Sequence, residues 1–548
     1  MTADRPLAPP TNAGPAPAAL YEAGLGHMQA GRPLEAQLCC RQALAVDPNH
    51  TDSLHLMGLL SLQARQYDHA IAWIARANQQ DPGTDYLFSL GTALESQGLH
   101  QEALKAFDRA VQLKPNDAEL WASRGNTLHR LRRFAEAVSD NRRAHELGPE
   151  SADICNNIGA SLQYLRRDEE ALSWFDKALA LRPNFIMALI NKASSLAQMR
   201  RIDETIATYR QVKAIDPANS EAESYLSLIY LLVGNFEAGW DLYGARWNAQ
   251  MRPESYPDFH QHLWHGQEAI CGKTILVFAD EGFGDTIQFA RYIPMLAARG
   301  ARVILSVEEA LRPVLSDMPG IAQCLPKPAP SLPPFDLHCP IGMLPLAFGT
   351  RLDTIPSTVP YLPPPSEARV HDWEQRLRER VGPDRTLRVG LAWSGRAEHT
   401  NDHNRSIPLQ MLRQLLDADA SFVSLQRDPR SGDQASLQTS RIVDLTSHLT
   451  DFAETLALMS CLDLVISVDT SVAHLAAASG RPTWILLPYL PDYRWLLDRD
   501  DSPWYPTARL FRQSEARSWE EVAERVWRAL EALRRPGRAN EVSATRDP

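Results

Sequence analysis

The sequence predicts an α-helical repeat solenoid in the first half of the chain and two parallel α/β sheet domains in the second half. Three observations lead to this fold class. Prolines that end helical segments recur every 33 or 34 residues, at Pro48, Pro82, Pro115, Pro149, Pro183 and Pro217. From about residue 251, short apolar strands alternate with helical segments. The proline-rich segment 354–368 separates those strands into two groups, as an interdomain connector does.

Composition and charge narrow the functional classes. The chain has 548 residues and a net charge of −11, which argues against a general nucleic-acid or anionic-membrane surface. Residues 1–17 lack the features of a signal peptide and are expected to form a disordered lead, and no apolar run reaches the roughly 18 residues that span a bilayer. The seven cysteines are scattered without paired spacing. We therefore expect a cytoplasmic protein with reduced thiols and no membrane span, nucleic-acid partner, metal site or resident cofactor.

Small residues recur in register with the prolines. They form rows at Gly24, Gly58, Gly91, Gly125, Gly159 and Ala193, and at Ala36, Ala70, Ala103, Ala137 and Ala171, whereas bulky residues recur at Ile74, Phe107, Phe175 and Tyr209. Small residues let paired helices approach closely while bulky ones fill the space between them. This pattern resembles the tetratricopeptide repeat family over residues 18–217, in six repeats. A degenerate seventh repeat at 220–247 completes a solenoid of residues 18–250, and its apolar residues predict that it docks onto the first sheet domain.

A solenoid of this family implies a concave groove that binds a partner, commonly a peptide. Asn157 and Asn191 occupy equivalent repeat positions and are candidates for hydrogen bonds to the backbone of an acceptor peptide. The alternative is a solvated polar face, because the matching positions of earlier repeats are not asparagine. The repeats therefore indicate a protein partner and leave the chemistry to the second half of the chain.

The second half of the chain has the strand–helix–strand pattern of parallel sheets. The first domain, 251–365, contains strands at 273–280 and 302–307 with a helix at 286–300 between them. The second domain, 366–535, contains five expected strands, at 387–393, 421–426, 442–446, 462–468 and 483–487. A terminal helix at 519–535 is expected to cross back onto the first domain, and residues 536–548 form a tail. Two such Rossmann-like domains facing a cleft form the arrangement called GT-B among glycosyltransferases.

Ligands of parallel sheets bind beyond the carboxyl ends of the strands, where four loops carry candidate residues. In the first loop, Gly282 and Gly284 allow a tight turn with close approach of a ligand, and Asp285 stands at the start of a helix. Asp285 is either a helix cap or a carboxylate that faces the cleft as a general base. The residues alone do not decide between these two roles.

The second and third loops offer polar and basic side chains. The loop 393–408 contains Ser394, Arg396 and Arg405, which are candidates to donate hydrogen bonds to a phosphate. Gln426, after the strand at 421–426, is a candidate contact for a nucleotide base or ribose, although surface turns have similar sequences. Long loops in compact folds are more often functional than idle, which favours the second loop.

The fourth loop opens a helix after a buried strand. Asp469, Thr470, Ser471 and His474 lie there, and the unpaired N–H groups of a helix N-terminus bind anions. An ordinary N-cap by Asp, Thr or Ser is the simpler alternative. Farther along, the aromatic segment 488–506 carries Arg494, which either lines the cleft or packs in the hinge between the sheet domains.

Two motifs in the sheet domains resemble the ADP-heptose:lipopolysaccharide heptosyltransferase family. They are the G-x-G-D turn at 282–285, followed by Pro294 and Leu296, and the D-T-S-x-x-H stretch that begins at Asp469. The resemblance covers about 270–515 and implies an inverting, metal-independent transferase with Asp285 as base and Thr470, Ser471 and His474 at the donor phosphate. Ser471 stands where that family usually has glycine, and the loop 393–408 is longer and lacks the family's usual lysine.

The combination of solenoid and transferase half resembles bacterial tetratricopeptide-repeat glycosyltransferases that modify proteins, including flagellin. That resemblance implies transfer of a sugar from a nucleotide donor to Ser or Thr hydroxyls of a protein that the repeats recruit. One alternative is a saccharide or lipid-linked acceptor, with the repeats as a scaffold. Another is a non-catalytic adaptor with a degenerate transferase half. The sugar, the nucleotide and the oligomeric state stay open.

Overall fold

The computed structural model describes residues 15–245, 259–382, 386–399 and 401–533. Most of the predicted lead, 1–17, and all of the predicted tail, 536–548, lie outside the described residues. The chain divides into two compact units, Met1–Ile215 and Asp216–Pro548, which are described one at a time. Within the described ranges, no helix is both long and apolar enough to cross a bilayer.

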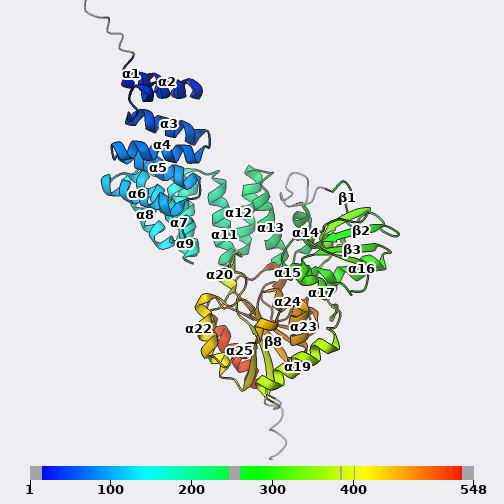
Figure 1. The fold of residues 1–548 in the computed structure, drawn as a ribbon. Helices are drawn as coiled ribbons and strands as arrows, with labels where there is room; N and C mark the ends of the chain where they lie inside the picture. Colours follow the sequence, from blue (N-terminus) through cyan, green and yellow to red (C-terminus); the bar gives the residue numbers. More distant parts are fainter. Residues whose placement is uncertain (1–14, 246–258, 383–385, 400, 534–548) are drawn as a thin grey trace, which may run out of the picture. The chain divides into compact units, whose positions relative to one another are not determined.

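The first unit is the predicted solenoid of paired helices (Figure 1). Each repeat contributes one first and one second helix, and each second helix ends close to one of the periodic prolines. The helices are α1 (Pro17–Gln29), α2 (Pro33–Val46), α3 (Thr51–Gln63), α4 (Tyr67–Gln80), α5 (Thr84–Ser96), α6 (His100–Leu113), α7 (Ala118–Arg130), α8 (Phe134–Leu147), α9 (Ala152–Tyr164), α10 (Asp168–Leu181), α11 (Ile186–Gln198) and α12 (Ile202–Ile215).

The rows of small and bulky residues meet inside the repeats. A methyl group added at Gly91 would lie 2.6 Å from the ring of Phe107, and one at Gly159 would lie 2.5 Å from the ring of Phe175. The glycine row is therefore needed because the bulky row occupies the space where a side chain would stand. In the fourth repeat, the buried Asn141 takes the position of the bulky residue and packs against Gly125.

The turns within the helix pairs share one backbone conformation. Gly31, Gly98 and Gly234 adopt positive φ, and four arginines do so at the equivalent positions, Arg65, Arg132, Arg166 and Arg200. Glycine adopts this left-handed conformation freely, whereas a side chain there costs about 1 kcal/mol. The spacing of 33 or 34 residues between these turns extends through Gly234, which lies in the predicted degenerate seventh repeat.

The seventh repeat belongs to the second unit. Its helices are α13 (Ser220–Leu232) and α14 (Phe236–Ala245). The Trp240 ring of α14 lies 6.3 Å from the ring of Phe289, which belongs to the first sheet domain. Tyr243 donates a hydrogen bond to Glu281, which follows the first long strand of that domain. The predicted docking of this repeat onto the first sheet domain is confirmed.

The described residues of the first sheet domain form a five-stranded parallel sheet in the order β1-β5-β2-β3-β4. Its strands are β1 (His262–Leu263), β2 (Thr274–Phe278), β3 (Arg302–Val307), β4 (Ile321–Pro326) and β5 (Leu337–Pro340). Its helices are α15 (Phe283–Phe289), η1 (Ala290–Tyr292), α16 (Ile293–Ala298), η2 (Glu309–Leu311), α17 (Arg312–Leu315), η3 (Ile341–Met343) and α18 (Leu344–Ala347). The single helix expected at 286–300 is divided at η1, because Pro294 has no N–H and favours a new helical start.

The second sheet domain repeats the pattern with the strand order β10-β9-β8-β6-β7 in its described residues. Its strands are β6 (Leu387–Ala392), β7 (Ala420–Ser424), β8 (Leu464–Val468), β9 (Thr483–Leu487) and β10 (Ala508–Arg512). Its helices are α19 (Glu367–Val381), α20 (Asp402–Arg405), η4 (Leu409–Leu412), α21 (Arg413–Leu416), α22 (Ser431–Thr439), η5 (Thr446–His448), α23 (Phe452–Ser460), α24 (Ser471–Ala478), η6 (Tyr493–Trp495) and α25 (Trp519–Leu533).

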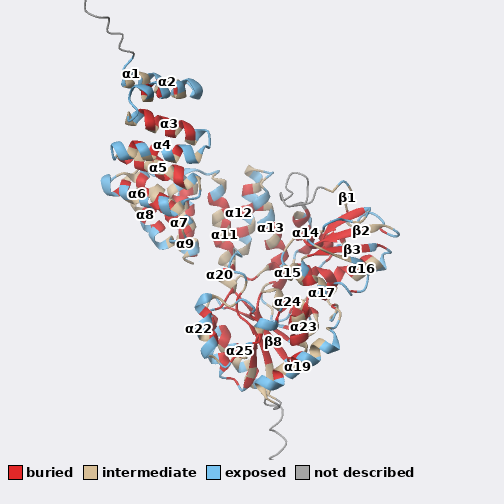
Figure 2. Cartoon of the chain, in the orientation of Figure 1, coloured by how far each residue is buried: buried red, intermediate tan, exposed pale blue. Residues whose placement is uncertain are grey.

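Two expectations for this domain are wrong. Residues 442–446 form only one isolated bridge, between Val443 and Val423, and no strand. Helix α25 packs on the second sheet itself, because its apolar face at Val522, Val526 and Leu530 joins the core beneath β6 and β8. The fold class is confirmed, since a helical solenoid precedes two five-stranded parallel sheets as in GT-B proteins. Figure 2 shows the strands of both sheets buried.

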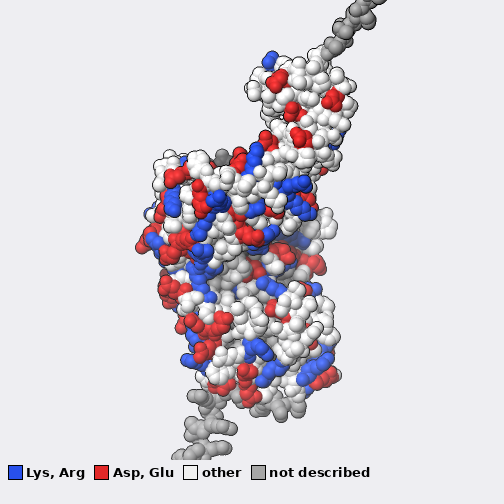
Figure 3. Space-filling model, turned by 90° about the vertical axis from the view of Figure 1, so that its left-hand side faces the viewer, with Lys and Arg blue, Asp and Glu red and all other residues white. Residues whose placement is uncertain are grey.

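Charge is spread evenly on the visible surface. Basic and acidic side chains are interspersed over the face in Figure 3. This agrees with the absence of a strongly basic composition in a chain of net charge −11.

Candidate functional site

Three neighbouring strands of the second sheet end at one edge and carry most of the candidate residues. In the parallel register, Ala392 of β6 pairs with Ser467 of β8, and Val468 of β8 pairs with Leu486 of β9. The loop after β6 contains Ser394 and Arg405, whereas the turn after β8 contains Asp469 to Ser471. The segment after β9 leads to Arg494 in η6. The carboxyl ends of these strands therefore bring together residues that are about 100 positions apart.

Helix α24 begins without a side-chain cap. Thr470 is its N-cap residue, and among the described residues its side chain forms no capping hydrogen bond. The Thr470 hydroxyl instead lies 3.1 Å from the hydroxyl of Ser467. Ser471 is the first residue of the helix. An uncapped first turn leaves N–H groups available to an anion, which favours the anion-binding interpretation of this stretch.

His474 has a packing role in this structure. Its ring is buried, with Nδ1 2.8 Å from the hydroxyl of Tyr505 and Nε2 3.7 Å from a carboxylate oxygen of Asp469. The Trp495 ring stacks on it with centroids 5.3 Å apart. Burial lowers the pKa of His474, so its imidazole is neutral at pH 7. Both ring nitrogens face protein groups, and a direct contact with a donor phosphate requires releasing one of them.

Gly284 faces His474 from the first sheet domain. A methyl group added at Gly284 would lie 2.8 Å from Cδ2 of His474. The sequence predicted that a ligand approaches closely at Gly284. In the structure the close neighbour of Gly284, in α15, is instead His474 of α24 in the second sheet domain. Gly282 is the N-cap of α15, and its N–H donates to Oδ2 of Asp285 at 3.1 Å.

Arg405 and Ser394 lie beside the start of α24. The Arg405 Nη1 donates to the main-chain oxygen of Asp469 at 3.0 Å. Gly395 leaves room for this arginine, since a methyl group there would lie 2.7 Å from Nη2. The Ser394 hydroxyl is buried and has no hydrogen-bond partner among the described residues. The loop after β6 thus supplies a fixed cation and a spare hydroxyl to this edge.

Arg396 and Gln426 are placed differently from each other. Arg396 is exposed, and its guanidinium lies 5.4 Å from the centroid of the Phe283 ring of α15. The Gln426 side-chain oxygen accepts hydrogen bonds from the main-chain N–H groups of Trp393 and Ser394, at 3.2 and 3.0 Å. Its contribution to a donor site is therefore indirect, because it fixes the backbone that carries Ser394.

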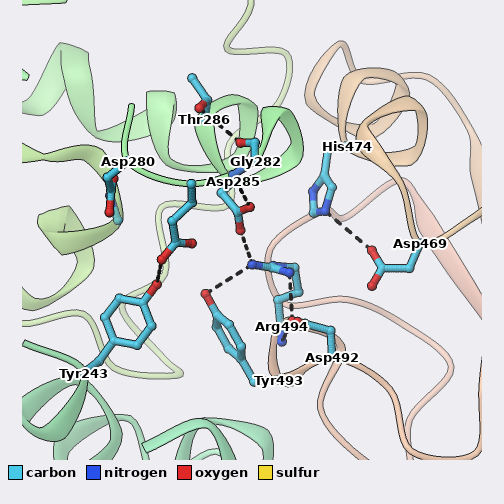
Figure 4. A network of polar contacts seen from close by, with 12 residues as sticks. Tyr243, Asp280, Gly282, Asp285, Thr286, Asp469, His474, Asp492, Tyr493 and Arg494 are labelled. Carbon is cyan, nitrogen blue, oxygen red and sulfur yellow. Dashed lines mark hydrogen bonds and ion pairs between the residues drawn. The ribbon is translucent and has the colours of Figure 1, made fainter. Parts of the chain in front are cut away.

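Asp285 is both a cap and one half of a partly buried ion pair (Figure 4). One carboxylate oxygen accepts the Gly282 N–H, and the other is paired with the guanidinium of Arg494. This pair joins α15 of the first sheet domain to η6 of the second, across 209 positions of sequence. The capping role and the role of a carboxylate facing the second domain therefore coexist.

Arg494 is surrounded by acidic side chains. It also contacts Asp492 at 2.9 Å and donates to the hydroxyl of Tyr493 at 3.4 Å. Burial disfavours its charge, but Asp492, Tyr493, Asp285 and Asp469 outweigh burial and raise the pKa of Arg494. Burial opposes ionisation of Asp469 too, yet His474, Arg494 and Arg405 lower its pKa overall. The sequence left the role of Arg494 open, and only its position between aromatic residues pointed to it.

A second buried arginine, Arg291, joins the two sheet domains at the hinge. Its Nε donates to the main-chain oxygen of Gln288 at 2.8 Å, and Nη1 donates to those of Pro356 and Trp504 at 3.1 and 2.7 Å. Nη2 donates to the Tyr361 hydroxyl at 3.3 Å. The sequence alone did not single out this residue. Arg291 lies in a predicted helix shortly before Pro294, and no local pattern there distinguishes a buried arginine from an exposed one.

In the first unit, the predicted groove residues contact other amides. The side chain of Asn157 donates to Asn126 at 2.8 Å, and that of Asn191 donates to Asn156 at 2.9 Å. These bonds link successive repeats. Their role in binding an acceptor peptide stays a prediction. Among the described residues, no group of three His, Cys, Asp or Glu side chains is arranged to hold a metal ion.

Comparison with known families matches each half of the chain separately. Residues 433–487 match the model of glycosyltransferase family 9 (heptosyltransferase). Residues 88–152 and 152–185 match tetratricopeptide repeat models, and residues 34–110 match the model of anaphase-promoting complex, cyclosome, subunit 3. Each match covers less than half of the chain. No curated protein gives a match.

The family 9 match contains β8, the whole of α24 and β9, and it supports a glycosyltransferase function for the unit with the two sheets. The repeat matches support a role of the first unit in protein interaction. Asp285 and Arg494 both lie outside the matched residues.

Solved structures resemble the repeats. A structure of Pseudomonas aeruginosa PilF is 19% identical and covers 38% of this chain and 96% of that chain, with a TM-score of 0.35. YrrB, a TPR protein with an unusual peptide-binding site, is 18% identical and covers 33% and 95%, with a TM-score of 0.30. The C-terminal part of a TPR repeat-containing protein from Cytophaga hutchinsonii is 16% identical and covers 42% and 97%, with a TM-score of 0.35. At these TM-scores the likenesses carry no argument about function.

Proposed function

We propose that the chain is an inverting, metal-independent glycosyltransferase that moves a sugar from a nucleotide-activated donor to Ser or Thr hydroxyls of a protein. The repeats recruit the acceptor, and flagellin is one acceptor consistent with the family resemblance. One observation carries the proposal. Asp285 of the first sheet domain contacts Arg494 of the second, and the uncapped start of α24, with Arg405 beside it, lies at the same edge of the second sheet. A base and an anion site on facing domains are what a single displacement requires.

In the proposed reaction, Asp285 takes the proton of the acceptor hydroxyl while the hydroxyl oxygen attacks the anomeric carbon. A new carbon–oxygen bond forms on the face opposite the leaving group, so the configuration inverts. The bond between the anomeric carbon and the phosphate oxygen breaks, and its electron pair stays on the nucleotide. The N–H groups of α24, with Arg405 and Arg494, stabilise that negative charge, and fixed donors of this kind are often the largest catalytic contribution.

Nucleotide binding and protein labelling test the proposal. Thermal unfolding with ADP, UDP, GDP and CMP identifies the nucleotide that stabilises the chain most. Sugar donors of that nucleotide, carrying a radiolabel, are then incubated with host lysate. Label on protein supports the proposal, whereas label only on glycolipid or free saccharide supports the alternative acceptor. Absence of stabilisation by every nucleotide contradicts an enzyme of this class.

Asp285→Asn tests the base. An amide can still accept the Gly282 N–H but cannot take a proton, so we expect transfer to fall by roughly a thousandfold while nucleotide binding persists. Asp451→Asn is the matched control, because Asp451 also caps a helix and lies 3.8 Å from an arginine, Arg369. The control keeps transfer near the wild-type rate. Equal losses in both variants would make Asp285 a cap only.

A further inference from the structure

Asp285 and Arg494 form an ion pair with each other in this structure. Each carboxylate oxygen of Asp285 accepts a hydrogen bond, one from the Gly282 N–H and one from Arg494. An acceptor hydroxyl that approaches Asp285 therefore has to displace one of these two partners to reach a carboxylate oxygen. Releasing the Gly282 N–H uncaps α15, so Arg494 is the partner whose departure leaves the fold of the first domain intact.

Arg494 is equipped to move to another anion. It is 9% exposed, and its Nε has no hydrogen-bond partner among the described residues. Its main-chain N–H is fixed by Asp492 Oδ1 at 3.1 Å, so the backbone of η6 stays in place while the side chain changes partner. A buried guanidinium N–H without a partner is costly, and a phosphate oxygen is among its strongest acceptors.

The start of α24, which has no side-chain cap among the described residues, lies beside Arg494. The strand before η6, β9, is the sheet neighbour of β8, which leads directly into Asp469 and α24. Figure 4 shows Arg494 between Asp285 on one side and Asp469 with His474 on the other. The buried hydroxyl of Ser394, which has no hydrogen-bond partner among the described residues, lies at the same edge of the sheet. Arg405 lies there too, and its Nε is 3.9 Å from Oδ1 of Asp402.

We propose that Arg494 is a donor-binding residue that is exchanged between Asp285 and the phosphate of the nucleotide donor. Without donor, Arg494 holds Asp285 as an ion pair and keeps it from acting as a base. When the donor binds, its phosphate takes over Arg494 and Asp285 is released toward the acceptor hydroxyl. This inference rests on the proposed function, and it makes the base available only when a donor is present to react.

Calorimetric titration tests the exchange, using whichever of ADP, UDP, GDP and CMP stabilises the wild-type chain most. Asp285→Asn removes the competitor for Arg494, so we expect nucleotide binding to tighten about three- to tenfold. Arg494→Gln removes the shared cation and weakens binding at least about tenfold, as truncated charge-assisted contacts do. In the double variant, Asp285→Asn no longer tightens nucleotide binding, because Arg494 is absent and cannot be released from Asp285 to the nucleotide. Asp451→Asn is the control and leaves affinity unchanged.

Each outcome bears on the proposal. Unchanged or weaker nucleotide binding in Asp285→Asn overturns the exchange, and this variant decides alone if Arg494→Gln does not fold. Tightening that persists in the double variant also overturns it, because the effect then comes from charge repulsion without Arg494. If the wild-type chain binds none of the nucleotides, the proposed function itself fails. If it binds nucleotide and transfers sugar without these affinity changes, only the exchange fails.

Discussion

Two arginines join the sheet domains of this chain, and they do so by different means. Arg291 uses all three guanidinium nitrogens on three main-chain oxygens and one hydroxyl, among the rings of Tyr361, Trp504 and Tyr505. Arg494 contacts two carboxylates, and its Nε has no partner among the described residues.

This difference distinguishes Arg291, a structural contact between the sheet domains, from Arg494, a residue suited to bind an anion. The hydrogen-bond partners of Arg291 are three main-chain oxygens and one hydroxyl, all of them neutral, and all three guanidinium nitrogens donate to them. These bonds hold one geometry. Two partners of Arg494 are charged carboxylates, and a bound anion can replace them. A fully satisfied polar network makes a structure unique, whereas a partly satisfied one is where ligand binding is to be sought.

The largest effect is expected at Arg291. Arg291→Met leaves three main-chain oxygens without their donors, two of them buried, and we expect the free energy of unfolding to fall by about 3 kcal/mol or more. Arg494→Met should cost less than half of this amount. Its partners Asp285 and Asp492 keep 19% and 35% of their side-chain surface exposed and regain water. Urea unfolding followed by tryptophan fluorescence compares the two, and equal losses would remove the distinction.

An effect of intermediate size is expected in the pH dependence of the free energy of unfolding, and it comes from His474, which lies near Arg494. Burial lowers the pKa of His474 below its ordinary value of 6.5. Below pH 6.5 the unfolded chain binds a proton that the folded chain does not, so the free energy of unfolding falls as the pH falls, by up to about 1.4 kcal/mol per pH unit. Above pH 6.5 both states are deprotonated and the contribution vanishes.

His474→Gln should remove that part of the pH dependence. Urea unfolding at pH 7.5 and pH 5.5 measures the change, with His448→Gln, which alters an exposed histidine, as the control. The His474 variant is expected to lose less stability between the two pH values than either the wild type or the control. Identical losses in all three chains would contradict a buried neutral imidazole.

The smallest effect is expected at Ser394. Its buried hydroxyl has no partner among the described residues, so Ser394→Ala should leave the free energy of unfolding unchanged or raise it by up to about 1 kcal/mol. Nucleotide binding should weaken by roughly three- to tenfold, because the proposed phosphate site loses a donor. Ser424→Ala is the control, since that hydroxyl accepts the Gln426 N–H at 3.2 Å and its removal costs stability. A loss of stability in Ser394→Ala would indicate a structural role instead.

Most of the fold was readable from periodic patterns. The proline interval of 34 residues located the helix pairs, and apolar runs located β2, β3, β6, β8 and β9, because both signals are local. The segment 442–446 has the composition of a strand but forms no ladder beyond Val443, since pairing depends on what the neighbouring strand leaves open. The same limit applies to α25, whose apolar face shows that it packs but not on which sheet.

The candidate site was readable only in part. Sequence order placed Asp285 and the stretch after Asp469 at strand ends, where parallel sheets bind ligands. It did not pair Asp285 with Arg494, which lies 209 positions later, and it did not show that Gln426 and His474 face protein groups. Side-chain partners across two domains are set by the tertiary fold, and no local pattern encodes them.

The seventh helical hairpin has a consequence for how the chain can be recombined. The unit that carries both sheets begins at Asp216, so α13 and α14 go with it although their sequence continues the repeat period. Trp240 and Tyr243 are already fitted to Phe289 and Glu281. The boundary at which another solenoid could be grafted onto this unit therefore falls at residues 215–216. The hairpin after this boundary contacts the first sheet domain and therefore has to stay with it.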